Sequence, residues 1–154
     1  MNSPSVPGGP DHPHDLRRFL EAQDGVHAQA LAELRRGSKR SHWMWFVFPQ
    51  LAGLGLSSTA NRFGIRSLEE ARAYLTHPVL GARLLACAAA MLSVDGRSAT
   101  AILGIPDDLK LRSCATLFAL VAEPGSVFEQ LLATYYGGDR DRKTLRLLGL
   151  EALD

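Results

Sequence analysis

The chain has 154 residues, 46% hydrophobic and 21% charged, which is usual for one globular domain with a single core. Its 17 basic and 16 acidic residues give a formal charge of +1, which argues against duplex nucleic acid or an anionic membrane as the partner. The apolar runs are far shorter than the roughly 18 residues that a membrane-spanning helix needs, so we expect no membrane segment.

The amino-terminal end has the composition of a tail. Residues 1–14 contain four prolines, two glycines and no apolar run, so we expect a disordered tail rather than a signal peptide, followed by one domain over residues 15–154. The cysteines, Cys87 and Cys114, lie in apolar contexts without C-x-x-C spacing. We therefore predict two buried, reduced thiols in a cytoplasmic protein, with no metal site.

Apolar residues at helical spacing, together with capping signals, predict an all-α, compact single-domain bundle of about eight or nine short helices. The first helical segment is expected over residues 15–23. It breaks at Asp24-Gly25, and the helical pattern resumes over residues 26–36, before Gly37. Serine–glutamate pairs at 67 and 70 and at 126 and 129 have capping-box spacing. The further helices are expected over residues 41–48, from Ser57 or Ser58 to Phe63, over 68–76, from a cap at His77 to Leu92, over 98–103, from Pro106 to about Ala122, from Ser126 to Tyr136, and over 141–148.

Residues 41–50 hold both tryptophans and two of the six phenylalanines. The apolar run before Pro49 would suit a buried strand or a buried helix, but no other segment alternates as a partner strand would. We therefore predict a short buried helix over residues 41–48, which Pro49 ends. This segment could serve only the core, or it could also form the wall of a pocket.

Polar side chains near this segment suggest a candidate site. Lys110 and Ser113 share one helix face, and with Thr116 they form a strip that either faces solvent or lines a cleft with His42 and Gln50. A basic cluster at residues 35–40 either complements a helix carboxyl end or binds phosphate. The candidate ligand-binding residues are His42, Trp43, Trp45, Gln50, Ser57, Lys110, Ser113 and Thr116.

Five ordered segments resemble the DUF1810 family of bacterial proteins of unknown function, over roughly residues 15–148. The resemblance implies a multihelical single-domain fold and no established activity. Relatives are sometimes labelled calpastatin, but the composition here is that of a packed domain and not of disordered inhibitory repeats. The matching segments are Gly37-Ser38-Lys39, residues 41–50, Gly53-Leu54-Gly55 with Ser57, Ala71-x-x-Tyr74-Leu75-x-His77-Pro78-x-Leu80-Gly81-x-Arg83-Leu84, and Pro106-Asp107-Asp108-x-Lys110-Leu111-x-Ser113-Cys114-x-Thr116-Leu117-Phe118.

The chain has no zinc-protease, nucleophile-elbow, paired-cysteine or dinucleotide-binding motif, so we assign no catalytic residue, cofactor or metal. We expect a ligand-binding or protein-interaction module, whose partner is an unknown small molecule or protein. The alternative is an enzyme that acts on a small nucleotide-like or phosphorylated metabolite in a tryptophan-walled cleft.

Overall fold

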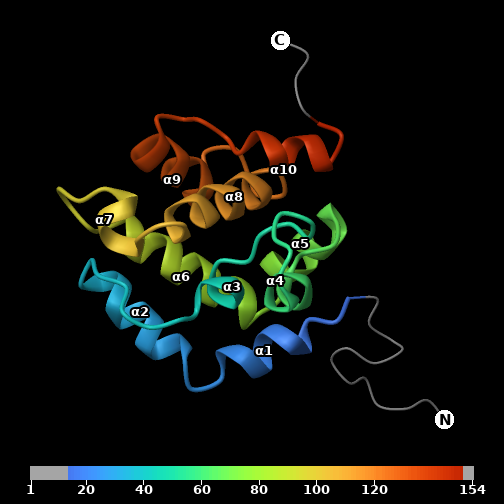
Figure 1. Cartoon of the computed structure of the whole chain (residues 1–154), viewed down its shortest axis with the longest axis horizontal. Helices are drawn as coiled ribbons and strands as arrows, with labels where there is room; N and C mark the ends of the chain where they lie inside the picture. Colours follow the sequence, from blue (N-terminus) through green and yellow to red (C-terminus); the bar gives the residue numbers. More distant parts are fainter. Residues whose placement is uncertain (1–13, 151–154) are drawn as a thin grey trace.

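The computed structural model describes residues 14–150, which form ten helices and no sheet (Figure 1). The all-α prediction is therefore confirmed, and residues 1–13 of the predicted tail lie outside the described part. The number of described helices exceeds the predicted eight or nine because α1 and α2 are separate helices. They are separated by Asp24, which is extended, and by Gly25, which has a positive φ. The helices are α1 (Arg17–Gln23), α2 (His27–Arg35), α3 (Met44–Val47), α4 (Ser58–Phe63), α5 (Leu68–Thr76), α6 (Leu80–Leu92), α7 (Ala99–Leu103), α8 (Asp107–Ala119), α9 (Val127–Tyr136) and α10 (Arg142–Leu147).

Side-chain caps begin five of the ten described helices at the predicted places. Ser57, Ser98 and Asp141 each accept a hydrogen bond from the N–H three residues on. Ser67 and Ser126 do the same at the two predicted capping boxes. Each cap pairs one of the four N–H groups that a helix start leaves without a partner. Local side-chain chemistry therefore sets these boundaries.

The core is crossed by a chain of aromatic rings from α1 to α9. The rings of Phe19 and Tyr74 have centroids 5.0 Å apart, Tyr74 and Phe118 are 5.5 Å apart, and Phe118 and Phe128 are 5.6 Å apart. All four side chains are buried. Such pairs add about 0.5–1.5 kcal/mol each beyond the burial of their area. In Figure 1, α6 lies between α1 and α2 on one side and α8 and α9 on the other.

The tryptophan-rich segment is helical, as predicted, but only over the four residues of α3. It starts late because the N–H groups of Arg40 and Ser41 donate to the carboxylate of Glu33 and so hold the preceding chain outside the helix. Trp43 and Phe48 are buried, whereas Trp45 is partly exposed. After Pro49, the chain makes one isolated parallel bridge, between Leu51 and Ile65.

Within the described residues, no single helix is long and apolar enough to cross a membrane. One pair, α5 with α6, reaches that length and apolar content together, but it is bent by 87° at the break between the two helices. The buried Leu84, Cys87 and Met91 place much of α6 in the core of the domain.

Candidate functional site

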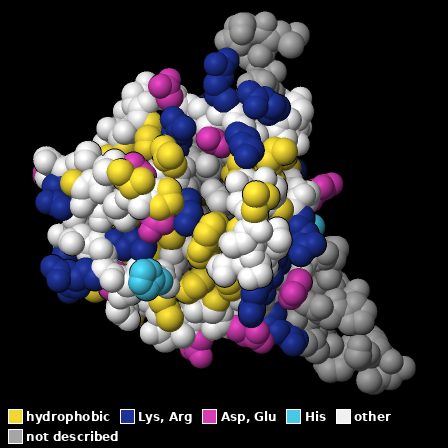
Figure 2. Space-filling view, in the orientation of Figure 1, with side chains coloured by type: hydrophobic (Ala, Val, Ile, Leu, Met, Phe, Trp, Pro, Cys, Tyr) yellow, Lys and Arg dark blue, Asp and Glu magenta, His cyan; other side chains and the backbone are white. Residues whose placement is uncertain are grey.

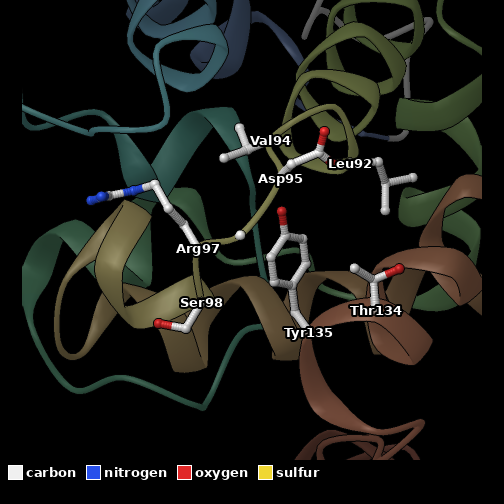
Figure 3. Close-up of a pocket in the computed structure, with 8 residues that line it drawn as sticks. Leu92, Val94, Asp95, Arg97, Ser98, Thr134 and Tyr135 are labelled. Atoms are coloured by element: carbon white, nitrogen blue, oxygen red, sulfur yellow. The ribbon is translucent and has the colours of Figure 1, made fainter.

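Of three surface cavities formed by residues 14–150, two are lined by polar groups that the fold already uses. The first, of about 480 Å³, lies beside Arg97 and Tyr135 (Figure 3). The guanidinium of Arg97 donates to the carbonyls of Gly37 and Ala101, and the Tyr135 hydroxyl donates to the carbonyl of Met91. Figure 3 shows the Arg97 side chain turned away from Tyr135 and Thr134. These groups close loops and leave little for a ligand.

The second cavity, of about 410 Å³, lies over an ion pair between Arg18 and Glu70. Both side chains are buried. The guanidinium of Arg18 also donates to the carbonyl of Gly64, and Glu70 accepts from the N–H of Arg66. This pair fastens α1 to the start of α5, so we assign it to the fold.

The third cavity, of about 240 Å³, lies beside the tryptophan-rich segment, and we call it the Trp45 pocket. Four parts of the chain form it: α3, the loop after Pro49, the first two turns of α8, and the start of α10. Its lining residues are Trp45, Gln50, Leu54, Gly55, Pro106, Leu109, Lys110, Ser113, Asp141 and Lys143. Apolar walls with a few polar groups are the usual composition of a ligand site.

Lys110 is the central cation of this pocket. Its Nζ lies 3.6 Å from the centroid of the Trp45 ring and 3.2 Å from Oδ1 of Asp107, one helical turn earlier on α8. An ammonium group over an indole face is held by the ring quadrupole, which contributes about 0.5–2 kcal/mol depending on desolvation. The ring and the carboxylate therefore fix the position of the charge.

Asp107 also binds a second lysine from another part of the chain. Nζ of Lys39 lies 2.9 Å from Oδ2 of Asp107 and 5.1 Å from the Trp43 ring centroid. The side chains of Lys39, Asp107 and Lys110 are only 8%, 17% and 18% exposed. Two ammonium groups thus share one carboxylate, which leaves an excess positive charge in a region of low solvent access.

Lysine is used sparingly in this chain, and all of it lies here. The 17 basic residues comprise 14 arginines and three lysines, namely Lys39, Lys110 and Lys143. Two of the lysines line the Trp45 pocket and the third shares Asp107 with Lys110. Lysine differs from arginine in presenting a compact point charge with three rotatable donors. The concentration of lysine here marks this site off from the rest of the surface.

Some polar groups of the pocket have no partner within residues 14–150. The side-chain amide of Gln50 and the ammonium of Lys143 make no hydrogen bond or ion pair there. Asp141 is the neighbouring carboxylate, 3.8 Å from the guanidinium of Arg112, whose Nε is buried without a hydrogen-bond partner in the described part of the chain. Gln50 and Lys143 are therefore the groups that a ligand could bind without breaking an internal contact.

The structure brings together four of the eight predicted site residues, Trp45, Gln50, Lys110 and Ser113, around this pocket. The other four lie elsewhere. Trp43 is buried and does not line the pocket, but its ring lies 5.1 Å from Nζ of Lys39, which shares Asp107 with Lys110. His42 is exposed and does not line the pocket.

Ser57 and Thr116 serve the backbone. The Ser57 hydroxyl caps α4, and the buried Thr116 hydroxyl donates to the carbonyl of Arg112 and accepts from the N–H of Asp141. Asp141 and Lys143 were not among the predicted site residues, and α10 brings them to the pocket from far along the chain. No local motif marked them, because only the packing of α10 on α8 gives them this position.

Glu33 holds the tryptophan-rich segment in place. Its buried carboxylate accepts hydrogen bonds from the Ser41 hydroxyl, from the N–H groups of Arg40 and Ser41, and from Nε1 of Trp43. Burial raises the pKa of Glu33, but these hydrogen bonds outweigh it and lower the pKa from 4.5 to about 2. The carboxylate is therefore charged at neutral pH and fixes the backbone that leads into α3.

Cys87 and Cys114 are free and buried, as predicted. Sγ of Cys87 lies 3.9 Å from Nδ1 of His27, the geometry of a cysteine–histidine pair. However, burial raises the pKa of Cys87 to about 12, and it lowers the pKa of His27. The thiol therefore stays protonated and is not a nucleophile. Among the described residues, no group of three or more His, Cys, Asp or Glu side chains could hold a metal ion.

Comparisons with known proteins agree with this fold. The model of a family described as a protein of unknown function, DUF1810, matches residues 13–148. A crystal structure of the conserved hypothetical protein Rv1873 from Mycobacterium tuberculosis is 55% identical in sequence, with a TM-score of 0.87. The match covers 90% of this chain and 99% of that one. No curated protein matches the chain significantly.

Proposed function

Since the chain belongs to the DUF1810 family, whose description assigns no activity, we propose its function from its own geometry: it is a ligand-binding module that takes a small organic anion into the Trp45 pocket. The ligand class comprises phosphorylated and carboxylated metabolites. The anion would meet Lys110 and Lys143, and a neighbouring polar group of the ligand would bind the Gln50 amide.

One observation carries this proposal: a lysine stacked on a tryptophan faces a cavity that holds a second lysine with no partner among residues 14–150. Lysine binds phosphate and carboxylate oxygens through charge-assisted hydrogen bonds, which are roughly twice as strong as neutral ones. In a partly desolvated pocket this attraction is screened less than at an open surface. An anion is the ligand that such a site favours.

The volume limits the size of the ligand. About 240 Å³ lies below the range of roughly 300–1,000 Å³ that is typical of pockets for drug-sized molecules. The pocket therefore suits a small acid, or the acidic end of a larger molecule. It does not enclose a whole nucleotide.

The test is a thermal-shift screen of the purified chain against phosphorylated and carboxylated metabolites, followed by titration of tryptophan fluorescence with each hit. A ligand present at about 100 times its dissociation constant should add about 2.7 kcal/mol to the free energy of unfolding. Lys110→Met should abolish the shift. Arg72→Met, which removes a positive charge from an exposed position on α5, should leave it unchanged. A screen with no hit, or equal shifts in the two variants, would reject the proposal.

The alternative, an enzyme that acts on a phosphorylated metabolite, uses the same pocket. There Asp141 and Lys143 are the ionisable groups beside Lys110. Incubating each hit with the protein and following phosphorus or proton NMR separates the two functions, since a binding module returns its ligand unchanged. Two free, buried thiols support a cytoplasmic setting, and the mycobacterial relative supports a bacterial one.

A further inference from the structure

The rim of the Trp45 pocket carries an unusual share of the exposed apolar side chains. Leu56 is 95% exposed and Ile105 is 79% exposed, and they directly follow and precede the lining residues Gly55 and Pro106. Leu109 lines the pocket and is half exposed. Leu147, also half exposed, lies within 3.5 Å of the position that a Cβ on Gly53 would take.

These four side chains come from the loop after Pro49, from the start of α8 with the residue two before it, and from α10, which are three segments whose other residues line the pocket. Figure 2 shows hydrophobic side chains on the face where α3, α8 and α10 lie in Figure 1, with Lys and Arg side chains among them and a further group of Lys and Arg over α10. Single exposed leucines are ordinary on protein surfaces, but several around one pocket mark a binding surface.

Charge complementarity indicates what covers this surface. The pocket is lined by Lys110 and Lys143, so the occupant must bring carboxylates together with apolar side chains. The pocket is too small for a large ligand but suits one acidic side chain, while the leucines lie around it at the surface. The Gln50 amide, which has no side-chain partner within the described residues, can bond a peptide group.

We propose that the pocket also takes a carboxylate side chain of a partner protein, presented by a short segment in which acidic and apolar residues alternate. The acidic side chain enters the Trp45 pocket and meets Lys110 and Lys143, and its apolar neighbours pack on Leu56, Ile105 and Leu109. This inference rests on the proposed function, because it uses the same pocket for the charged group, and it extends that function by assigning the apolar rim to the partner.

The experiment measures fluorescence anisotropy with three labelled octapeptides. One alternates leucine with aspartate, the second leucine with asparagine, and the third serine with aspartate. We expect the leucine–aspartate peptide to bind and the other two to bind at least about tenfold more weakly. The leucine–asparagine peptide lacks the charge, and the serine–aspartate peptide lacks the apolar contacts. Equal binding of the first and third peptides would overturn the proposal.

Two variants separate this inference from the proposed function. The double variant Leu56→Ser, Ile105→Ser should weaken the binding of the leucine–aspartate peptide about tenfold. It should leave the affinity for the small anions benzoate and phenyl phosphate unchanged, since the side chains of Leu56 and Ile105 are exposed. Lys110→Met should weaken the binding of the leucine–aspartate peptide, of benzoate and of phenyl phosphate. If the small anions bind and the peptide is insensitive to the double variant, the peptide proposal fails alone. If neither anions nor peptide bind, both fail.

A lipid surface is the competing occupant of exposed leucines among basic residues. Sedimentation with vesicles of phosphatidylglycerol and phosphatidylcholine tests it directly. We expect no association of the wild-type protein with these vesicles. Association that is lost in the Leu56→Ser, Ile105→Ser variant would overturn the peptide proposal by assigning these side chains to a membrane.

Discussion

Asp107 is an internal anion that occupies Lys110 and Lys39. Any carboxylate or phosphate that enters the Trp45 pocket must compete with it for the ammonium group of Lys110. The affinity of the pocket for an anion therefore depends on this carboxylate, although Asp107 does not line the cavity. Lys39 weakens that competition, since it pairs with the other oxygen of the Asp107 carboxylate.

We expect Asp107→Asn to tighten the binding of a small anion about five- to tenfold, because the competing charge is removed while a hydrogen-bonding group of similar shape stays. Lys39→Met should have the opposite effect, since Asp107 then pairs with Lys110 alone. Isothermal titration with one hit from the screen measures both. Equal affinities for the wild type and Asp107→Asn would show that the carboxylate does not compete.

Glu33 makes stability depend on pH in the acid range. Its pKa of about 2 in the folded protein lies below the ordinary 4.5 because hydrogen bonds from residues 40–43 outweigh the effect of burial. A lowered pKa means that the stabilisation is complete above the unfolded value and is lost as the pH falls through the folded value.

We therefore expect Glu33→Gln to lower the free energy of unfolding by about 2 kcal/mol near neutral pH, and by much less at about pH 2, where the wild-type carboxylate becomes protonated. Urea unfolding of both proteins at the two pH values measures this. Glu129→Gln is the control, because that carboxylate is only partly buried, accepts one hydrogen bond from the N–H of Gly125, and lies 3.8 Å from the partly exposed guanidinium of Arg140. A loss that is the same at both pH values would contradict the role of the charge.

At the scale of the helices, the sequence was a good guide wherever a boundary depends on a local side chain. Leu68–Thr76 was predicted to the residue, because Ser67 caps its start and Pro78 stands just beyond its end. The tryptophan-rich segment was predicted four residues too long, because the buried Glu33, which lies in another helix, holds its beginning. Distant contacts of this kind leave no mark in a local pattern.

His77 makes the corner between α5 and α6. Its Nδ1 accepts hydrogen bonds from the N–H groups of Val79 and Leu80, at 3.1 and 3.2 Å, in the capping role that the sequence predicted. Only a neutral imidazole can accept at this nitrogen. In the folded protein, burial lowers the pKa of His77 below its ordinary value of 6.5, which favours the neutral form that the cap requires.

His77 should therefore stabilise the fold fully above about pH 6.5, and this contribution should be lost as the pH falls through the lowered folded value. We expect His77→Ala to lower the free energy of unfolding by about 1 kcal/mol near neutral pH, as is typical for the loss of a cap. His77→Asn retains an acceptor and should restore much of this without the pH dependence. Thermal unfolding of the three proteins from about pH 5 to about pH 8 measures both effects. A cost for His77→Ala that does not change with pH would contradict the cap.

At the scale of the whole molecule, the candidate site depends on segments that are far apart in the sequence. The candidates on α3, in the loop after it and on α8 could be predicted, because Trp45, Gln50, Lys110 and Ser113 occur in dense local clusters of apolar and polar residues. Lys143 could not, since its place at the pocket depends on how α10 packs against α8. The contact that fixes this packing is made by Thr116, a predicted site residue that lies outside the pocket.

The Thr116 hydroxyl is fully buried and bonds both helices, donating to the carbonyl of Arg112 and accepting from the N–H of Asp141. Thr116→Val keeps the shape but leaves the Asp141 N–H without its acceptor, which costs about 1–3 kcal/mol when the group remains buried. We expect faster hydrogen exchange in α10 and weaker anion binding, because α10 then holds Lys143 less firmly at the pocket.

Thr76→Val is the matched control for this variant. The Thr76 hydroxyl makes the same kind of hydrogen bond, to the carbonyl of Arg72 four residues earlier, but it is exposed and contacts no second helix through that group. It should change neither the exchange of α10 nor anion affinity. Hydrogen-exchange mass spectrometry and titration with the same ligand measure both variants. If Thr116→Val behaves like Thr76→Val, then the apolar contacts of α10 and the ion pair between Arg112 and Asp141 suffice to position it, and the pocket does not need the hydroxyl link between the two helices.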